Sequence, residues 1–288
     1  MVNEKELIKT IENNDVSKLN KLLTKGLNPN EHTTLKGFTP IHLAVISGRL
    51  EMVEILLQHG GDPNVLSKSS RELPELLTPL QTAIISRAPE KYDITRTLIR
   101  YGANVNLFKS NSDIGMGPPV IMAIAKKDYT MVKLLLDNGA DVNAYIIGKD
   151  GCQVKPIGQA AYVGDVKIVE LLIQYGAKVE ESNDNLSTPY HLSAYKGYLD
   201  ILKFLFNIYP APNIVGCYKT TPLFSAALSN LENLDVIKFL VEAGADVNFI
   251  DMMGNSVLYY ALRQKKSTVV SYLTEHGGRL ITGGKEAR

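Results

Sequence analysis

The sequence predicts an all-α solenoid of helix–turn–helix units joined by hairpin-like loops. Three recurring features predict this fold: a Thr-Pro pair, a small residue four positions after the proline, and a glycine roughly twenty positions after it. The chain has 288 residues, 45% of them hydrophobic and 21% charged, which is an ordinary balance for a folded protein and argues against wholesale disorder.

The first helix of each unit begins at the Thr-Pro pair. The threonine oxygen can accept a hydrogen bond from an unpaired N–H group of the first turn, and proline has no N–H group to leave unpaired. The clearest copies are Thr39-Pro40-Ile41-His42, Thr78-Pro79-Leu80-Gln81, Thr188-Pro189-Tyr190-His191 and Thr221-Pro222-Leu223-Phe224, with weaker copies at Pro119 and Pro156. The small residues are Ala44, Ala83, Ala123, Ala160, Ser193 and Ala226, which allow close helix packing.

The second helix of each unit follows a short turn and carries apolar pairs three or four residues apart, such as Met131-Val132 with Leu135-Leu136. A glycine then permits the left-handed conformation that ends a helix. These glycines include Gly60, Gly102, Gly139, Gly176 and Gly244. Pro210-Ala211-Pro212-Asn213 replaces the glycine tail once, so we expect an irregular helix end there.

The unit resembles the ankyrin repeat, whose period is about 33 residues and whose signature is T-P-L-H-x-A. Matching tails occur at 102–106, 139–143 and 244–248, which read Gly-Ala-Asn-Val-Asn or Gly-Ala-Asp-Val-Asn. We expect a single ankyrin-repeat domain over 1–288, with capping repeats at about 1–33 and 251–281 because end repeats present a polar outer face. The central repeats are anchored at Pro40, Pro79, Pro119, Pro156, Pro189 and Pro222, and the end repeats at Glu6 and Val257. Long loops are expected at 65–77, 107–117 and 144–154.

Composition and motifs exclude several classes of function. The net charge is +1, without the basic excess that nucleic-acid binding or attachment to acidic membranes usually needs. Two cysteines, Cys152 and Cys217, are too few for a disulfide framework and indicate a reducing compartment. The start of the chain lacks a secretory pattern, and no apolar run approaches the roughly 18 residues of a membrane span.

No catalytic or nucleotide-binding motif was found, so the sequence predicts no enzyme activity, no cofactor and no metal. His42 and His191 occupy the histidine position of the ankyrin signature, where the resemblance implies that the imidazole ties neighbouring loops together. Cys152 falls in a long loop and could be a reactive thiol, but the sequence supplies no fixed basic neighbour.

The resemblance implies a partner-binding concave face whose leading positions are the sixth residues after the anchors. These positions hold Ile46, Ile85, Tyr162, Tyr195 and Leu228, as well as Ala125. Tyrosines are effective interface residues because they bury much area and keep a polar tip. The alternative is that this column packs against neighbouring helices, which by itself favours apolar residues.

Loop tips provide a second set of candidate contacts. They are Phe38, Tyr145, Tyr218 and Met252, and an alternative is that the loops fold back over their own side chains. Asn143 and Asn248 each follow Asp-Val with a leucine eight residues upstream, which looks like the asparagine-hydroxylation context of many animal ankyrin repeats. The competing interpretation is that this asparagine bonds across its loop.

The function implied is a non-catalytic protein-interaction module, namely a scaffold, adaptor or inhibitor. One alternative is a secreted effector of an intracellular bacterium or virus that captures host proteins, and another is an enzyme or small-molecule sensor built on the repeats. We expect a protein partner, no nucleic acid, no membrane and a monomeric chain. The expected location is the cytoplasm, with the nucleus or a host cytoplasm as alternatives.

Overall fold

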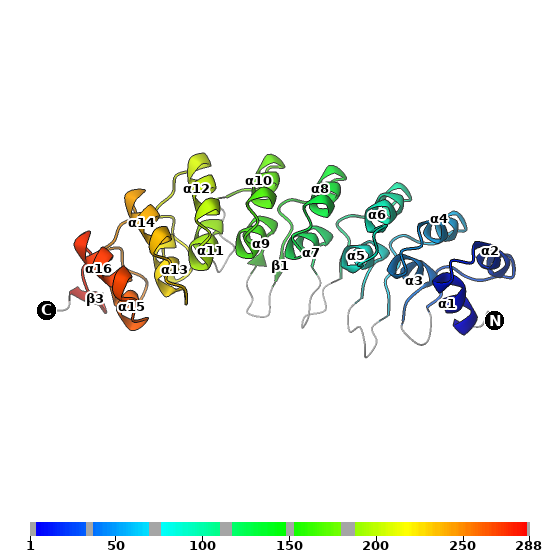
Figure 1. Cartoon of the computed structure of the whole chain (residues 1–288), viewed down its shortest axis with the longest axis horizontal. Helices are drawn as coiled ribbons and strands as arrows, with labels where there is room; N and C mark the ends of the chain where they lie inside the picture. Colours follow the sequence, from blue (N-terminus) through cyan, green and yellow to red (C-terminus); the bar gives the residue numbers. More distant parts are fainter. Residues whose placement is uncertain are drawn as a thin grey trace. The chain divides into compact units, whose positions relative to one another are not determined.

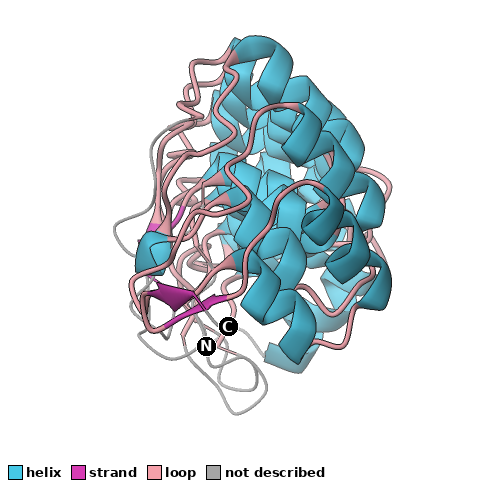
Figure 2. Cartoon of the chain, turned by 90° about the vertical axis from the view of Figure 1, so that its left-hand side faces the viewer, coloured by secondary structure: helices cyan, strands magenta, loops and turns pink. Residues whose placement is uncertain are grey.

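The computed structural model describes residues 4–32, 37–68, 76–109, 117–147, 153–179 and 188–286. The chain forms two compact units, Met1–Lys149 and Asp150–Arg288, and each is described by itself. Both units consist of successive helix pairs with their connecting loops on one side (Figures 1 and 2). The predicted all-α repeat architecture is therefore confirmed. Cys152, which the sequence suggested as a reactive thiol, lies outside the described residues.

Unit 1 contains four helix pairs followed by a short strand. The first helices are α1 (Glu4–Glu12), α3 (Pro40–Ile46), α5 (Pro79–Ile85) and α7 (Pro119–Ala125). The second helices are α2 (Val16–Thr24), α4 (Leu50–Gln58), α6 (Lys91–Arg100) and α8 (Tyr129–Asp137). Strand β1 (Ile146–Ile147) lies in the predicted loop 144–154, for which the sequence indicated no strand.

Unit 2 repeats this plan. Its first helices are α9 (Pro156–Val163), α11 (Pro189–Lys196), α13 (Pro222–Leu228) and α15 (Val257–Arg263). Its second helices are α10 (Val166–Gln174), α12 (Leu199–Ile208), α14 (Leu234–Glu242) and α16 (Ser267–Glu275). The remaining elements are β2 (Gln153–Val154), a 3₁₀ turn at Cys217–Lys219, and the strands β3 (Ile281–Thr282) and β4 (Lys285–Glu286), which pair antiparallel.

The Thr-Pro pairs do begin the first helices. Each predicted anchor proline is the first residue of its helix, and Thr78 shows the cap directly, because its Oγ1 accepts a hydrogen bond of 3.1 Å from the Gln81 N–H. The irregular end predicted before Pro210 is also confirmed. Helix α12 stops at an extended Tyr209, whose carbonyl oxygen accepts a bond of 2.6 Å from the Tyr190 hydroxyl.

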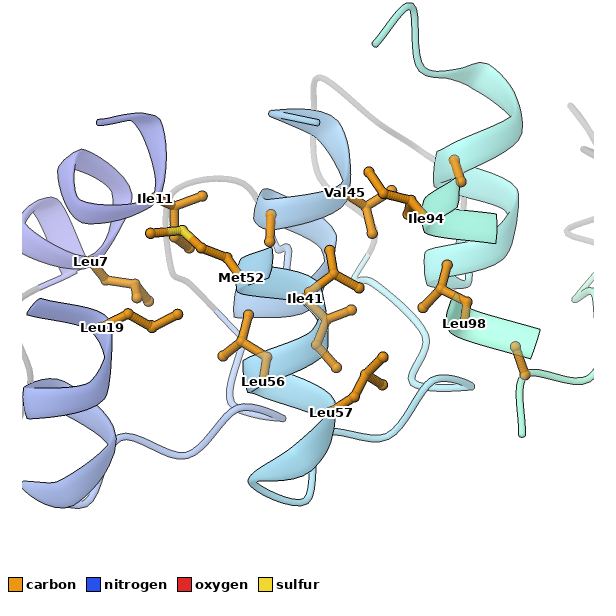
Figure 3. Close-up of a cluster of buried hydrophobic side chains, with 14 of the residues drawn as sticks. Leu7, Ile11, Leu19, Ile41, Val45, Met52, Leu56, Leu57, Ile94 and Leu98 are labelled. Atoms are coloured by element: carbon orange, nitrogen blue, oxygen red, sulfur yellow. The ribbon is translucent and has the colours of Figure 1, made fainter. Parts of the chain in front are cut away.

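The core of unit 1 lies between the helix layers and passes from one pair to the next. Figure 3 shows Leu7 and Leu19 of the first pair, Ile41 and Met52 of the second, and Ile94 of the third contributing to one buried cluster. All five side chains are almost completely shielded from water. No single pair could bury its own apolar face, so each repeat is stabilised mainly by its neighbours.

In most repeats the turn between the two helices uses a left-handed residue; the turns after α5 and α13 do not. Gly164 adopts φ 78° in unit 2, whereas Lys127 adopts φ 54° at the corresponding position of unit 1. A side chain in this conformation costs roughly 1 kcal/mol relative to glycine. Gly164 also has no room for a side chain, because a Cβ atom there would lie 2.4 Å from the ring of Tyr198.

Candidate functional site

Buried polar side chains at the same position of three first helices, α3, α5 and α11, each bond to the following loop. In unit 1, His42 Nε2 lies 2.9 Å from the Leu77 carbonyl oxygen of the next loop. In unit 2, His191 Nε2 lies 3.1 Å from the Thr220 carbonyl oxygen. Gln81 performs the same role one repeat after His42, with its Nε2 donating to the Gly117 carbonyl oxygen at 3.2 Å. The structural role that the resemblance implied for both histidines is confirmed.

Both histidines are neutral at physiological pH. Burial lowers the pKa of His42 and of His191 to about 4, and the bonds to the neighbouring carbonyls only partly offset this. A carbonyl oxygen accepts hydrogen bonds and cannot donate them, so Nε2 carries the proton in each ring. Nδ1 is occupied as well, since it lies 2.8 Å from the Oγ1 of the threonine that precedes the same helix. Neither ring has a nitrogen left for catalysis.

Five asparagine side chains form a second set of ties in the loops after the second helices. In each case Nδ2 donates to the carbonyl oxygen of the glycine that comes after the second helix of the following repeat. Oδ1 accepts a hydrogen bond from the N–H group two residues after that glycine. The side chains are those of Asn30, Asn64, Asn106, Asn213 and Asn248. Asn248 therefore bonds across its loop, as the competing interpretation held, to Gly277 and Arg279.

The ties fix the spacing of the first helices. The solvent-facing sides of these helices carry the predicted partner-binding positions. In unit 1, Ile46 is 44% exposed and Ile85 is half-buried. Together with Ile8 and Leu43 they line a groove of about 440 Å³, with Glu12 and Arg87 also in its wall. The groove is thus apolar along its floor and open to solvent.

The column of unit 2 is aromatic. Tyr162 and Tyr195 are 46% and 40% exposed, and Leu228 is half-buried. The ammonium group of Lys196 lies 3.9 Å from the centroid of the Tyr162 ring, which is a cation–π contact between neighbouring first helices. Exposed aromatic side chains held by such contacts are already ordered, so a partner loses little side-chain entropy by packing on them.

Sequence reasoning missed one first-helix residue in each unit. It overlooked Ile8 on α1 and Arg263 on α15, which belong to the end repeats. The signal was available, because the sixth residue after the anchor at Val257 is Arg263. Ile8 could not be found in this way, since the groove that it lines depends on how α1 packs against α3.

The predicted loop-tip residues divide into two groups. Tyr218 and Met252 are 69% and 63% exposed, Tyr145 is half-exposed, and the Met252 N–H donates to the Tyr218 carbonyl oxygen at 2.9 Å. Phe38 is different, and the prediction that it is an exposed contact was wrong. It is only 4% exposed, because its ring stacks on the His42 imidazole at a centroid distance of 5.7 Å.

A second hollow lies between two loops of unit 1. Phe108, Tyr145, Ile146 and Ile147 line this hollow of about 450 Å³ together with Asp141. Among the described residues, no three histidine, cysteine, aspartate or glutamate side chains come together as a metal site requires.

Comparison with known proteins identifies the architecture. The family model for ankyrin repeats matches three times, over residues 7–109, 120–215 and 210–282, which covers most of the chain. The chain belongs to the ankyrin-repeat family. Ankyrin repeats typically form non-catalytic modules that mediate protein–protein interaction. In the part of the chain that the structure describes, none of the helices is both long and apolar enough to cross a bilayer.

Similar regions occur in proteins of different kinds. The human 2-5A-dependent ribonuclease is 40% identical over 78 residues, which are 27% of this chain and 10% of that protein. The transient receptor potential cation channel subfamily A member 1 of Drosophila melanogaster is 33% identical over 38% of this chain and 10% of the channel. The fowlpox virus ankyrin repeat protein FPV031 is 36% identical over 30% of this chain and 23% of its own length. The chain therefore matches less than a quarter of each of these relatives.

Proposed function

We propose that this ankyrin-repeat chain is a non-catalytic scaffold, adaptor or inhibitor that binds a partner protein on the solvent-exposed face of its first helices. The observation that carries the proposal is the column of large exposed side chains on that face, including Ile46, Tyr162 and Tyr195. Large apolar side chains in water lower solubility unless a partner covers them, and aromatic residues are the commonest energetic centres of interfaces.

The surrounding structure favours binding over packing as the reason for these residues. In an isolated unit the repeats already cover their apolar faces through Ile41, Val45 and Met52, all of which are fully buried. Ile46 follows Val45 directly and remains 44% exposed, so it adds little to the core. A polar residue at that position would preserve stability equally well, so the isoleucine favours partner binding as the reason for an apolar side chain there.

The same contacts do not favour the enzyme or sensor alternative. The groups with strongly shifted pKa values, His42 and His191, are buried and have both ring nitrogens engaged in hydrogen bonds. Another shifted group, the Asp128 carboxylate, is bound by the Lys91 ammonium, the Tyr92 hydroxyl and the Met131 N–H. Each of these groups joins secondary-structure elements and leaves no reactive atom facing a cavity.

A second candidate is an effector that captures host proteins. Similarity to several ankyrin repeat proteins of fowlpox virus favours it, including one that is 42% identical over 22% of this chain. Both candidates use the same surface and differ only in the origin of the partner. The effector interpretation would be supported if one protein is captured repeatedly from an animal-cell lysate and no protein is captured from a bacterial lysate.

The test is affinity capture with surface variants. We expect wild-type protein to retain a partner that the pairs Ile46→Ser with Ile85→Ser and Tyr162→Ser with Tyr195→Ser retain at least tenfold less. The control is Tyr129→Ser with Ile208→Ser, which changes equally exposed residues on second helices. Circular dichroism melting should show that all three variants stay folded. Equal capture by the wild type and by both first-helix pairs would refute the proposal.

A further inference from the structure

The first helices of unit 2 differ from the second helices in the sign of their charge. Across α9, α11, α13 and α15, Lys196 and Arg263 are the only lysine, arginine, aspartate or glutamate residues. The second helices mix both signs, with Lys167 and Glu170 on α10 and Lys203 and Asp200 on α12. In unit 1, by contrast, α3, α5 and α7 carry no such charges. The charged residues within the first helices of unit 2 are thus two cations.

Both cations are held by tyrosines and leave their charge available. The Lys196 ammonium lies 3.9 Å from the Tyr162 ring centroid. The Arg263 guanidinium lies 5.8 Å from the Tyr259 ring centroid and donates a bond of 3.4 Å to the Tyr259 hydroxyl. Neither forms an ion pair with a carboxylate of the residues that the structure describes. A ring orients a cation without neutralising it, so both can pair with an incoming anion.

The surface between the two cations is apolar. Helix α11 contributes Tyr195 and Leu192, and α13 contributes Leu228, all of them at least partly exposed. Lys196 and Arg263 lie two first helices apart, which corresponds to about 16–20 Å at the usual helix spacing of about 8–10 Å. An extended peptide covers this distance with about five or six residues.

We propose that this face of unit 2 binds an acidic segment of a partner protein, in which two carboxylates about five or six residues apart flank large apolar side chains. The carboxylates pair with Lys196 and Arg263, and the apolar residues pack on Tyr195 and Leu228. This inference rests on the proposed function and names the chemistry of its partner. A nucleic-acid strand fits less well, because two cations offer few phosphate contacts.

The experiment selects peptides from a random 12-residue display library on the full chain and measures their affinity by fluorescence polarisation. We expect enrichment of aspartate and glutamate on both sides of leucine, phenylalanine or tyrosine. Binding of these peptides should weaken about tenfold in a Lys196→Glu, Arg263→Glu variant, since each exposed ion pair contributes a factor of about two to five. The matched control is Lys167→Glu with Lys203→Glu, exposed lysines of second helices, which should change affinity less than twofold.

A charge exchange separates specific pairing from general disturbance. Peptides whose acidic residues are replaced by lysine should bind the Lys196→Glu, Arg263→Glu variant and not the wild type. The milder variant Lys196→Gln, Arg263→Gln, with its melting temperature measured in parallel, covers the case in which charge reversal unfolds the unit. The inference is overturned if no peptide is enriched, if enriched peptides lack acidic residues, or if charge reversal leaves their binding unchanged. It also falls if a 20-nucleotide oligothymidylate binds more tightly than the peptides and displaces them.

One further variant distinguishes this inference from the proposed function. Peptides whose binding is lost in Tyr162→Ser, Tyr195→Ser but unchanged by charge reversal would refute the acidic segment and leave the binding face intact. Peptides that bind every one of these variants as well as the wild type would refute both.

Discussion

Replacing both buried histidines by glutamine should remove most of the acid sensitivity of this protein between pH 7 and pH 5. Burial lowers the pKa of His42 and His191 from 6.5 to about 4. In this interval the unfolded chain binds protons that the folded chain does not, so stability is complete above pH 6.5 and is lost as the pH falls towards 4. Each pKa unit corresponds to 1.36 kcal/mol, which gives about 3 kcal/mol per histidine at pH 4 and about 2 kcal/mol at pH 5.

Glutamine is a suitable replacement because the chain already uses it in the same position. Gln81 accepts a bond of 3.0 Å from the Thr78 N–H and donates one of 3.2 Å to the Gly117 carbonyl oxygen. The double variant His42→Gln, His191→Gln should therefore keep both ties in a form that does not titrate. Each unit contains one of the two histidines, so each should gain its own share of acid resistance.

Urea unfolding at pH 7 and pH 5, followed by circular dichroism, measures this effect. The wild type should lose about 2 kcal/mol more per unit than the double variant when the pH is lowered. Single variants should each show about half of the total difference. If the wild type and the double variant lose the same free energy of unfolding, the assignment of neutral, buried imidazoles is wrong.

Three other changes test the local structure. Gly164→Ala should destabilise unit 2 by about 2 kcal/mol or more, because of the positive φ and the contact with the Tyr198 ring. Lys127→Gly should stabilise unit 1 by roughly 1 kcal/mol, because glycine adopts a positive φ without strain. Thermal melts that shift in the opposite directions would contradict this. Asn248→Ala should cost about 1–3 kcal/mol because two inter-repeat bonds are lost, and intact mass spectrometry of the native protein should show no added oxygen. Lys266→Met should destabilise the end of unit 2 by about 1–3 kcal/mol in urea unfolding, because the buried ammonium donates to the carbonyl oxygens of Ala226 and Leu231. An unchanged midpoint would argue against a stabilising role for these two hydrogen bonds.

The helices were predictable from sequence because their signals are local. Thr78-Pro79 supplies a cap and a pre-set backbone angle within two residues, so the start of α5 does not depend on distant contacts. Even Val257, which lacks the motif, was placed correctly as the first residue of α15 because the repeat period fixes its position. Repetition converts weak local signals into a reliable assignment.

The exposure of the loop side chains was less predictable because it depends on tertiary contacts. Phe38 lies two residues before Pro40 and stacks on His42, whereas Tyr218 lies four residues before Pro222, adopts φ 53° and is 69% exposed. Likewise, the pairing of Lys196 with Tyr162 depends on the distance between two first helices. Sequence therefore identified the candidate face, and the structure was needed to show which of its residues are exposed and which cations are available.

Site-specific photo-cross-linking tests most directly whether the first-helix face binds a protein. A benzophenone amino acid would replace Tyr195 on α11 in one sample and Ile208 on α12 in another, since both residues are more than a third exposed in the same unit. After irradiation in cell lysate, we expect a discrete protein adduct from position 195 and none from position 208. The same adducts from both positions, or an adduct from position 208 alone, would contradict a partner-binding first-helix face.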